Sequence, residues 1–433
     1  MTDTQIYERI VEILHKEVVY ATGCTEPIAL AYAAAVARKH LGCTPDKIEA
    51  FVSPNLMKNG MAVKVPGTGL PGMDVAAAVG VTGGDPNGGL DVLHHLSAEA
   101  VEKAKDLLAK KRVFVDIADT ELPLYAEAKL SRGNHWSRVV IQGSHTNIIR
   151  IETDEKIFLS KEDSGSVTKD PNEDFLHSLN LKILYNFATA VPLNRIEFME
   201  EAGLVNDALS RAGLQKEYGL CLGKSMQDDL QNGLSIDNLH DRIVMETTAA
   251  SDARMGGAPL PAMTNAGSGD QGITATVPVN VTTRYVNASR EKHIRALALS
   301  HITAIYIHSF YPKLSALCAT ATAAMGAAVG MTLLFDGGYT ELEATIANMT
   351  AEHIGMICDG AGDGCSLKIA TAVDAAYRAV FLSRKGIRVN GTEGLVSNTA
   401  DESIRNIGTL ATKGLKVADK EVLRIMISKN KIG

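Results

Sequence analysis

The segment from Cys358 to Cys365 has the clearest chemical potential, because two cysteines lie seven positions apart with three glycines between them. Glycine lets a backbone fold tightly around a bulky inorganic group, and its N–H groups can hydrogen-bond to cluster sulfides. A third thiol, Cys318, lies forty positions before Cys358 in a stretch of small residues. These thiols predict a metal site, although buried cysteines are also ordinary core residues in a helix rich in Ala and Gly.

Three thiolates rather than four would matter for chemistry. A cubane cluster held by three cysteines leaves one iron without a protein ligand, and that iron can act as a Lewis acid on a substrate heteroatom. Catalytic metals generally keep such an open position, whereas structural metals are closed. Zinc bound by Cys318, Cys358 and Cys365 is the chemical competitor, and spacing alone leaves both options open.

A fourth cysteine, Cys24, stands in the motif GCTEP directly before an expected helix. The N-terminus of a helix favours negative charge, so the position predicts a lowered pKa and an accessible thiolate. Such a thiolate could be a fourth cluster ligand, a proton-transfer group or a nucleophile. A thiol in a buried turn is the plain structural alternative.

Three polar loops are candidates for handling a small substrate. Asn55 and Lys58 lie in SPNLMKNG, where a turn is expected after a strand, and His145 and Asn147 lie in SHTN between two strands. Ser268 belongs to a glycine-rich polar segment, 251–272, that matches no nucleotide-binding pattern. Taken singly, each loop is also an ordinary turn.

The elements that must position these residues change character along the chain. Short β-branched segments with turn residues between them predict strands at 48–53, 62–65, 113–117, 125–130, 138–142 and 148–153. Helical periodicity predicts helices at 1–16, 26–40, 75–79, 97–110, 175–190, 195–213, 291–309, 314–335, 340–357, 369–383 and 401–427. A polar stretch, 162–174, is expected to be a linker. The predicted fold class is therefore α+β: an N-terminal α+β domain with a short-stranded sheet at 1–165, then a mainly α-helical domain carrying the three cysteines at 166–433.

Composition narrows the classes of function. The chain has 433 residues, of which 45% are hydrophobic and 21% charged, as in soluble globular proteins. A net charge of −7 without a basic run argues against nucleic-acid binding. The start of the chain lacks the features of a signal peptide. Residues 314–335 are uncharged over a length that could cross a bilayer, but Ala, Thr, Gly and Ser dominate them, so a buried helix and no membrane partner are expected.

The motifs GCTEP, SPNLMKNG, SHTN, SDARMGG, NAGSGDQGI, LSALCA and MICDGA resemble those of the L-cysteine desulfidase family, which is related to the α chain of iron–sulfur L-serine dehydratase. The resemblance runs from Gln5 to the C-terminus. It implies an oxygen-sensitive [4Fe-4S] cluster, with Cys318, Cys358 and Cys365 matching the ligand positions and Cys24 matching the proposed proton acceptor. The seven-residue gap suits the desulfidases, since dehydratases space the equivalent pair more widely.

The resemblance also implies a reaction. The open iron would bind the β-sulfur of L-cysteine, and Cys24 as thiolate would take the α-proton. Loss of sulfide would leave aminoacrylate, which gives pyruvate and ammonia in water without pyridoxal phosphate (PLP). Asn55, Lys58, His145, Asn147 and Ser268 would hold the carboxylate and ammonium groups of the substrate.

Two other functions compete with this one. The same cluster chemistry would serve an L-serine or L-threonine dehydratase, in which iron binds a hydroxyl. A non-catalytic iron–sulfur or zinc sensor, or an amino-acid-binding protein, would hold metal without eliminating anything. A cytoplasmic location and a small amino-acid substrate are expected, and the sequence leaves open whether the chain forms a homodimer.

Overall fold

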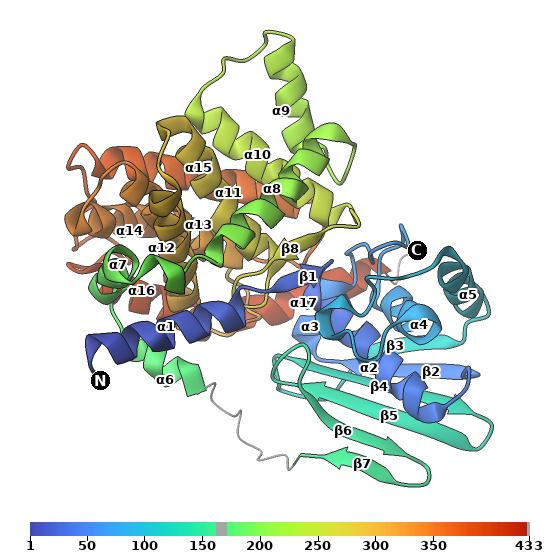
Figure 1. Ribbon diagram of the computed structural model, residues 1–433. Coiled ribbons are helices and arrows are strands. Elements are labelled where there is room, and N and C mark those ends of the chain that lie inside the picture. Colours follow the sequence, from blue (N-terminus) through green and yellow to red (C-terminus); the bar gives the residue numbers. More distant parts are fainter. Residues whose placement is uncertain (162–170, 431–433) are drawn as a thin grey trace.

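Figure 1 shows the computed structural model, which describes residues 1–161 and 171–430. A six-stranded mixed sheet with helices on one face lies beside a larger assembly of helices (Figure 1). The predicted class, an α+β part followed by a mainly helical part, is confirmed. The boundary predicted between residues 165 and 166 lies outside the described residues.

The sheet has the strand order β3-β2-β4-β5-β6-β7, in which only β2 and β3 run parallel. The strands are β2 (Lys47–Val52), β3 (Val113–Ile117), β4 (Tyr125–Arg132), β5 (His135–Gln142), β6 (Ile148–Thr153) and β7 (Ile157–Ser160). Alternate residues point to opposite faces of a strand, so Ile48, Ala50 and Val52 bury one face together with their partners on β4. Helix α2 (Thr25–Leu41) covers that face with small side chains, as its Ala-rich sequence predicts.

Three more helices complete this part of the molecule: α3 (Pro54–Gly60), α4 (Met73–Gly83) and α5 (Ala98–Ala109), with a 3-10 turn at Gly89–Asp91. Residues 54–60 form a helix and not the expected turn. The Ser53 side chain caps this helix by accepting a hydrogen bond from the amide of Leu56, and Pro54 suits its first turn.

The helical part is built from α6 (Pro171–Ser178), α7 (Leu181–Ala190), α8 (Met199–Gln215), α9 (Leu222–Gln231), α10 (Leu239–Met255), α11 (Gly269–Val286), α12 (Arg290–His308), α13 (Ala319–Leu334), α14 (Tyr339–His353), α15 (Cys365–Ser383), α16 (Ala400–Thr409) and α17 (Lys416–Asn430). The uncharged helix α13 packs among α11, α12, α14 and α15, and is buried as predicted. A Cβ atom on Gly326 would lie 2.4 Å from the carbonyl oxygen of Ser300, so only glycine allows α12 and α13 to pack this closely. No helix among the described residues has the length and apolarity to cross a membrane.

Both ends of the chain connect the two parts. Helix α1 (Asp3–Glu17) packs against the helical core through Ile10 and Leu14, and β1 (Tyr20–Thr22) pairs with β8 (Pro261–Met263). The C-terminal helix α17 returns to lie against α3 (Figure 1). Residues from distant stretches of the sequence therefore meet where the sheet-bearing part faces the helices.

Several predicted elements are wrong. Residues 62–65 form no strand, because Val63 and Val65 pack into two separate clusters and Lys64 makes only an isolated bridge to Pro71. The helix predicted at 175–190 is divided into α6 and α7. The Asn180 side chain caps α7 by accepting a hydrogen bond from the amide of Ile183. The helix predicted at 401–427 is interrupted by a π-turn at Leu410–Gly414. Helices α9, α10 and α11 and strands β1, β7 and β8 were not predicted. Of the linker predicted at 162–174, residues up to 170 lie outside the described residues, and residues 171–174 belong to α6 and are therefore helical.

Candidate active site

Two of the predicted metal ligands are brought together by a short antiparallel contact. Leu317 pairs with Ile357, the amide of Cys318 donates to the carbonyl of Met356 at 3.0 Å, and the amide of Cys358 donates to the carbonyl of Ala316 at 2.7 Å. Side chains alternate between the faces of such a pair, so the side chains of residues 318 and 358 lie on the same face as diagonal neighbours. Burial and the neighbouring Cys358 together raise the pKa of the Cys318 thiol to about 11.

The third cysteine reaches the same place from the glycine-rich loop. Cys365 begins α15, and its amide donates to the carbonyl of Gly362 at 2.9 Å. Gly360 has φ +101°, and a Cβ there would lie 2.5 Å from the carbonyl oxygen of Lys58, so glycine is required. Burial raises the pKa of Cys365, as do the charge of Asp270 and the neighbouring thiols at 318 and 358. The three thiols are neighbours, yet no group of three or more His, Cys, Asp or Glu in the described ranges is already arranged to hold a metal ion.

Cys24 lies at the N-terminus of α2 and is almost fully buried, with 7% of its surface exposed. It belongs to a small cluster with Val63 and Met255, against which Cys365 packs. Its Sγ donates to Oε2 of Glu26 at 2.9 Å. Burial and the charge of Glu26 raise the pKa of Cys24, although Arg254 opposes them. The expectation of a thiolate was therefore wrong, because burial and a neighbouring carboxylate outweigh the helix N-terminus.

The glycine-rich segment covers Cys24 from the helical side. Arg254, near the end of α10, forms an ion pair with Asp270 at 3.1 Å and donates from Nη2 to the carbonyl of Gly23 at 3.0 Å. Ser268 caps α11 by accepting from the amide of residue 271. His145 is buried, and its Nδ1 would lie 3.8 Å from a Cβ built on Gly267.

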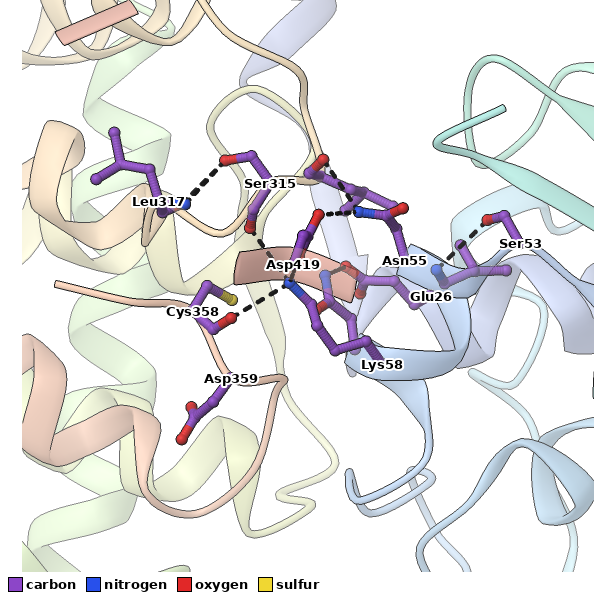
Figure 2. A network of polar contacts seen from close by, with 12 residues as sticks. Glu26, Ser53, Asn55, Lys58, Ser315, Leu317, Cys358, Asp359 and Asp419 are labelled. Carbon is purple, nitrogen blue, oxygen red and sulfur yellow. Dashed lines mark hydrogen bonds and ion pairs between the residues drawn. The ribbon is translucent and has the colours of Figure 1, made fainter. Parts of the chain in front are cut away.

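Lys58 is 1% exposed and each of its ammonium protons has an acceptor (Figure 2). Nζ lies 2.5 Å from Oδ1 of Asp419, 3.3 Å from the carbonyl oxygen of Ser315 and 3.2 Å from that of Cys358. Asn55 donates to the other oxygen of Asp419 at 2.5 Å and to the carbonyl of Leu314 at 3.4 Å. We call these contacts of Asn55, Lys58 and Asp419 the clamp. It joins α3, both cysteine-bearing segments and α17.

Residues 87–424 match a family described as the serine dehydratase alpha chain. The chain belongs to this family. Proteins named UPF0597 are similar over nearly their whole length. The UPF0597 protein of Actinobacillus pleuropneumoniae serotype 3 is 48% identical over 428 residues, 99% of each chain. That of Chromobacterium violaceum is 46% identical over 428 residues, again 99% of each, and UPF0597 protein YhaM of Salmonella paratyphi C is 45% identical over 426 residues, 98% of each.

The predicted relation to the iron–sulfur serine dehydratase α chain is thus confirmed at the level of the family. The serine dehydratase alpha chain family consists of lyase-like, iron–sulfur-related proteins. The donor set at residues 318, 358 and 365 fits such a group, because all three donors are thiols and a glycine-rich loop runs between two of them. The raised pKa values of Cys318 and Cys365 also fit, since a metal ionises a coordinating thiol that is otherwise protonated.

The predicted substrate residues are not all in one place. His145 and Ser268 lie on the loops around Cys24. Asn55 and Lys58 lie beside the cysteine segments, but the clamp already uses their donors. Asn147 is exposed and bonds to the carbonyl of residue 142 within its own turn and to Lys161, so its predicted contact with substrate gains no support.

Four buried polar residues around Cys24 were missed: Glu26, Asn59, Arg254 and Asp270. All of them lie in motifs that the sequence already marks as unusual, namely GCTEP, SPNLMKNG, SDARMGG and NAGSGDQGI. The motifs indicated the right segments. Which side chain in each motif points inward could not be read from spacing alone.

Proposed function

We propose that this chain is an iron–sulfur-dependent lyase that converts L-cysteine to sulfide, pyruvate and ammonia, and that it acts in the cytoplasm on a free amino acid. Two observations support the proposal: the segments of Cys318 and Cys358 pair with each other, and Cys365 packs against the cluster that contains Cys24, whose thiol donates to Glu26. The desulfidase-like spacing of Cys358 and Cys365 favours sulfur elimination. Dehydration of L-serine or L-threonine is the second candidate, favoured by the description of the family.

Cys318, Cys358 and Cys365 would hold a [4Fe-4S] cluster, which when bound supplies an iron without a protein ligand as a Lewis acid for the β-heteroatom. The remaining work falls to the chain's own residues. Helices α10 and α11 close the site from the helical side, and α2 and α3 close it from the other. Cys24 and Glu26 are buried there, and their removal from bulk water strengthens the electrostatic interaction between them.

Cys24 is the candidate base for the α-proton. In the free protein it is a thiol that donates to Glu26, so it can take a proton only after losing its own. The carboxylate of Glu26 is one reason why the thiol keeps its proton. A positive charge bound beside Glu26 would offset that effect and favour the thiolate when substrate is present.

The test is to purify the protein without oxygen, measure iron and acid-labile sulfide, and assay L-cysteine and L-serine for sulfide, pyruvate and ammonia. Cys318→Ser, Cys358→Ser and Cys365→Ser should each lower the iron content. Cys24→Ser should retain iron and lower turnover about 10²- to 10⁴-fold, as expected for loss of a general base. Cys43→Ser and Cys221→Ser, which alter cysteines outside this group, should leave both properties unchanged.

The ratio of kcat/KM for the two amino acids separates the two candidate reactions. Turnover of L-serine without turnover of L-cysteine would replace the desulfidase by the dehydratase. Stable metal with no turnover of either would leave a sensor or binding protein. Loss of iron in Cys24→Ser would make Cys24 a ligand and refute its role as base.

A further inference from the structure

Glu26 is a buried carboxylate whose hydrogen-bond donors are all uncharged. Oε1 accepts from the Asn59 amide at 3.1 Å, and Oε2 accepts from the Cys24 thiol at 2.9 Å and the Thr25 hydroxyl at 3.2 Å. Within the described part of the chain, no Lys or Arg lies at ion-pair distance from it. The guanidinium of Arg254 is paired with Asp270 instead.

A buried carboxylate without a cation costs considerable free energy unless it is protonated or finds a counter-charge. Burial raises the pKa of Glu26, but the influence of His145 and the hydrogen bonds from Cys24 and Asn59 lower it by more. Burial lowers the pKa of His145, although the charge of Glu26 opposes this shift. Glu26 therefore keeps its negative charge, and no Lys or Arg among the described residues pairs with it directly.

Two enclosed polar atoms beside Glu26 also lack partners. These atoms are Oδ1 of Asn59 and Nε2 of His145. Both residues are more than nine-tenths buried, yet neither atom has a hydrogen-bond partner. The side-chain amide of Asn59 is oriented by its hydrogen bond to Glu26. His145 packs on Gly267, and the carbonyl of Gly267 accepts a hydrogen bond from Thr25, the residue before Glu26. Enclosed polar atoms usually have partners, so orphaned acceptors around one carboxylate point to a missing donor.

We propose that Glu26, Asn59 and His145 bind the α-ammonium group of the substrate; this inference rests on the proposed amino-acid lyase and assigns the part of the site that recognises the amine. A primary ammonium offers three N–H donors and one positive charge, which match a carboxylate, an amide oxygen and a neutral imidazole nitrogen. Because the other oxygen of Glu26 holds the Cys24 thiol, an ammonium on this group places the adjacent carbon beside that thiol.

The site should therefore select for an amine and not merely for a thiol. Cysteamine carries thiol and ammonium without a carboxylate, whereas 3-mercaptopropionate carries thiol and carboxylate without an ammonium. The two compounds separate the ammonium contact from every other contact of L-cysteine. Loss of a hydrogen-bonded charge pair lowers affinity by about 10- to 100-fold.

The experiment measures binding of both compounds by calorimetry to wild type, Glu26→Gln and Glu246→Gln, under anaerobic conditions with loaded and with metal-free protein. Glu246 is a partly buried carboxylate paired with Arg284 outside the site and serves as the control. In Glu26→Gln, cysteamine should bind about 10- to 100-fold more weakly, and 3-mercaptopropionate should change less than twofold. The KM for L-cysteine should rise by a factor similar to that for cysteamine.

If Glu26→Gln weakens the binding of both compounds equally, Glu26 has a structural role and the inference is overturned. If the binding of neither compound changes, the inference is also overturned. Wild-type protein that binds neither compound in either form would also overturn it. Failure of the proposed function is a different result, namely wild-type protein that binds cysteamine through Glu26 yet turns over no amino acid.

Discussion

The clamp makes the C-terminal helix part of the site, and replacing Asp419 by Asn tests this directly. The change removes the carboxylate that pairs with the Lys58 ammonium, which is 1% exposed and keeps two carbonyl acceptors. Breaking a buried ion pair from one side costs about 3–5 kcal/mol. The Asp419 side chain is 17% exposed, so we expect about 3 kcal/mol, near the lower limit.

This free energy should appear in the opening of α17, which contacts the rest of the protein mainly through α3 and the π-turn before it. Each 1.4 kcal/mol is a tenfold change in an equilibrium constant, so 3 kcal/mol makes the undocked helix about 100-fold more populated. Hydrogen exchange followed by mass spectrometry should show α17 amides exchanging about 100-fold faster in Asp419→Asn. Helix α9, which packs on α8 and α10, should exchange at the wild-type rate.

Glu421→Gln is a close control, because Glu421 lies on the same helix and forms an exposed pair with Arg424. Exposed pairs contribute about 0–1 kcal/mol, so this variant should change the exchange of α17 by less than about fivefold. Lys58→Met combined with Asp419→Asn should cost less than the sum of the two single changes. Exchange within threefold of wild type in Asp419→Asn, or strict additivity in the double variant, would refute the clamp.

Three further predictions concern the interior. His301 is buried, and burial lowers its pKa to about 3, whereas an unfolded histidine titrates near 6.5. Below pH 6.5 the unfolded state therefore binds more protons than the folded state. The free energy of unfolding should decrease as the pH is lowered, by up to about 1.4 kcal/mol per pH unit. Urea unfolding at pH 7.5 and 5.5 should show a smaller loss in His301→Gln than in wild type, and an equal loss would contradict this. In metal-free protein, Cys24 should be alkylated faster in Glu26→Gln than in wild type, because the carboxylate of Glu26 raises the pKa of the thiol. Alkylation resolved by residue measures this rate, and a rate equal to that of wild type at every pH would exclude the influence of Glu26. Gly360→Ala should lower the free energy of unfolding by about 1–3 kcal/mol and should lower the iron content, because φ at this position is +101° and the new Cβ would meet the carbonyl of Lys58. An iron content equal to that of wild type would argue against a tight loop at Cys358.

The sequence predicted much of the architecture because local patterns fix local structure. The Ala-rich helix after Pro27 and the alternating strands from 113 to 153 were found from periodicity, and they are confirmed. Predictions failed where the pattern was short or mixed. Residues 62–65 alternate like a strand, but their apolar side chains enter two different clusters.

For the site, spacing and residue type selected the cysteines at 318, 358 and 365, since two of these thiols are separated by a glycine-rich loop that could fold around an inorganic group. Tertiary structure decided what the other residues do. Cys24 stands before a helix, where a thiolate was expected, yet burial and Glu26 keep it protonated. Lys58 was expected to hold substrate, yet its three protons are taken by acceptors on segments that lie more than 250 residues further along the chain.

The difference has a simple physical origin. Helices, strands and turns depend on neighbours within a few residues, and the sequence by itself therefore determined most of them, together with the motifs that contribute to the site. Charge state and hydrogen-bond saturation depend on solvation and on groups brought from distant segments. These properties of Cys24, Glu26 and Lys58 exist only once α2, α3, α10 and α17 have packed around them, and only the tertiary structure could decide them.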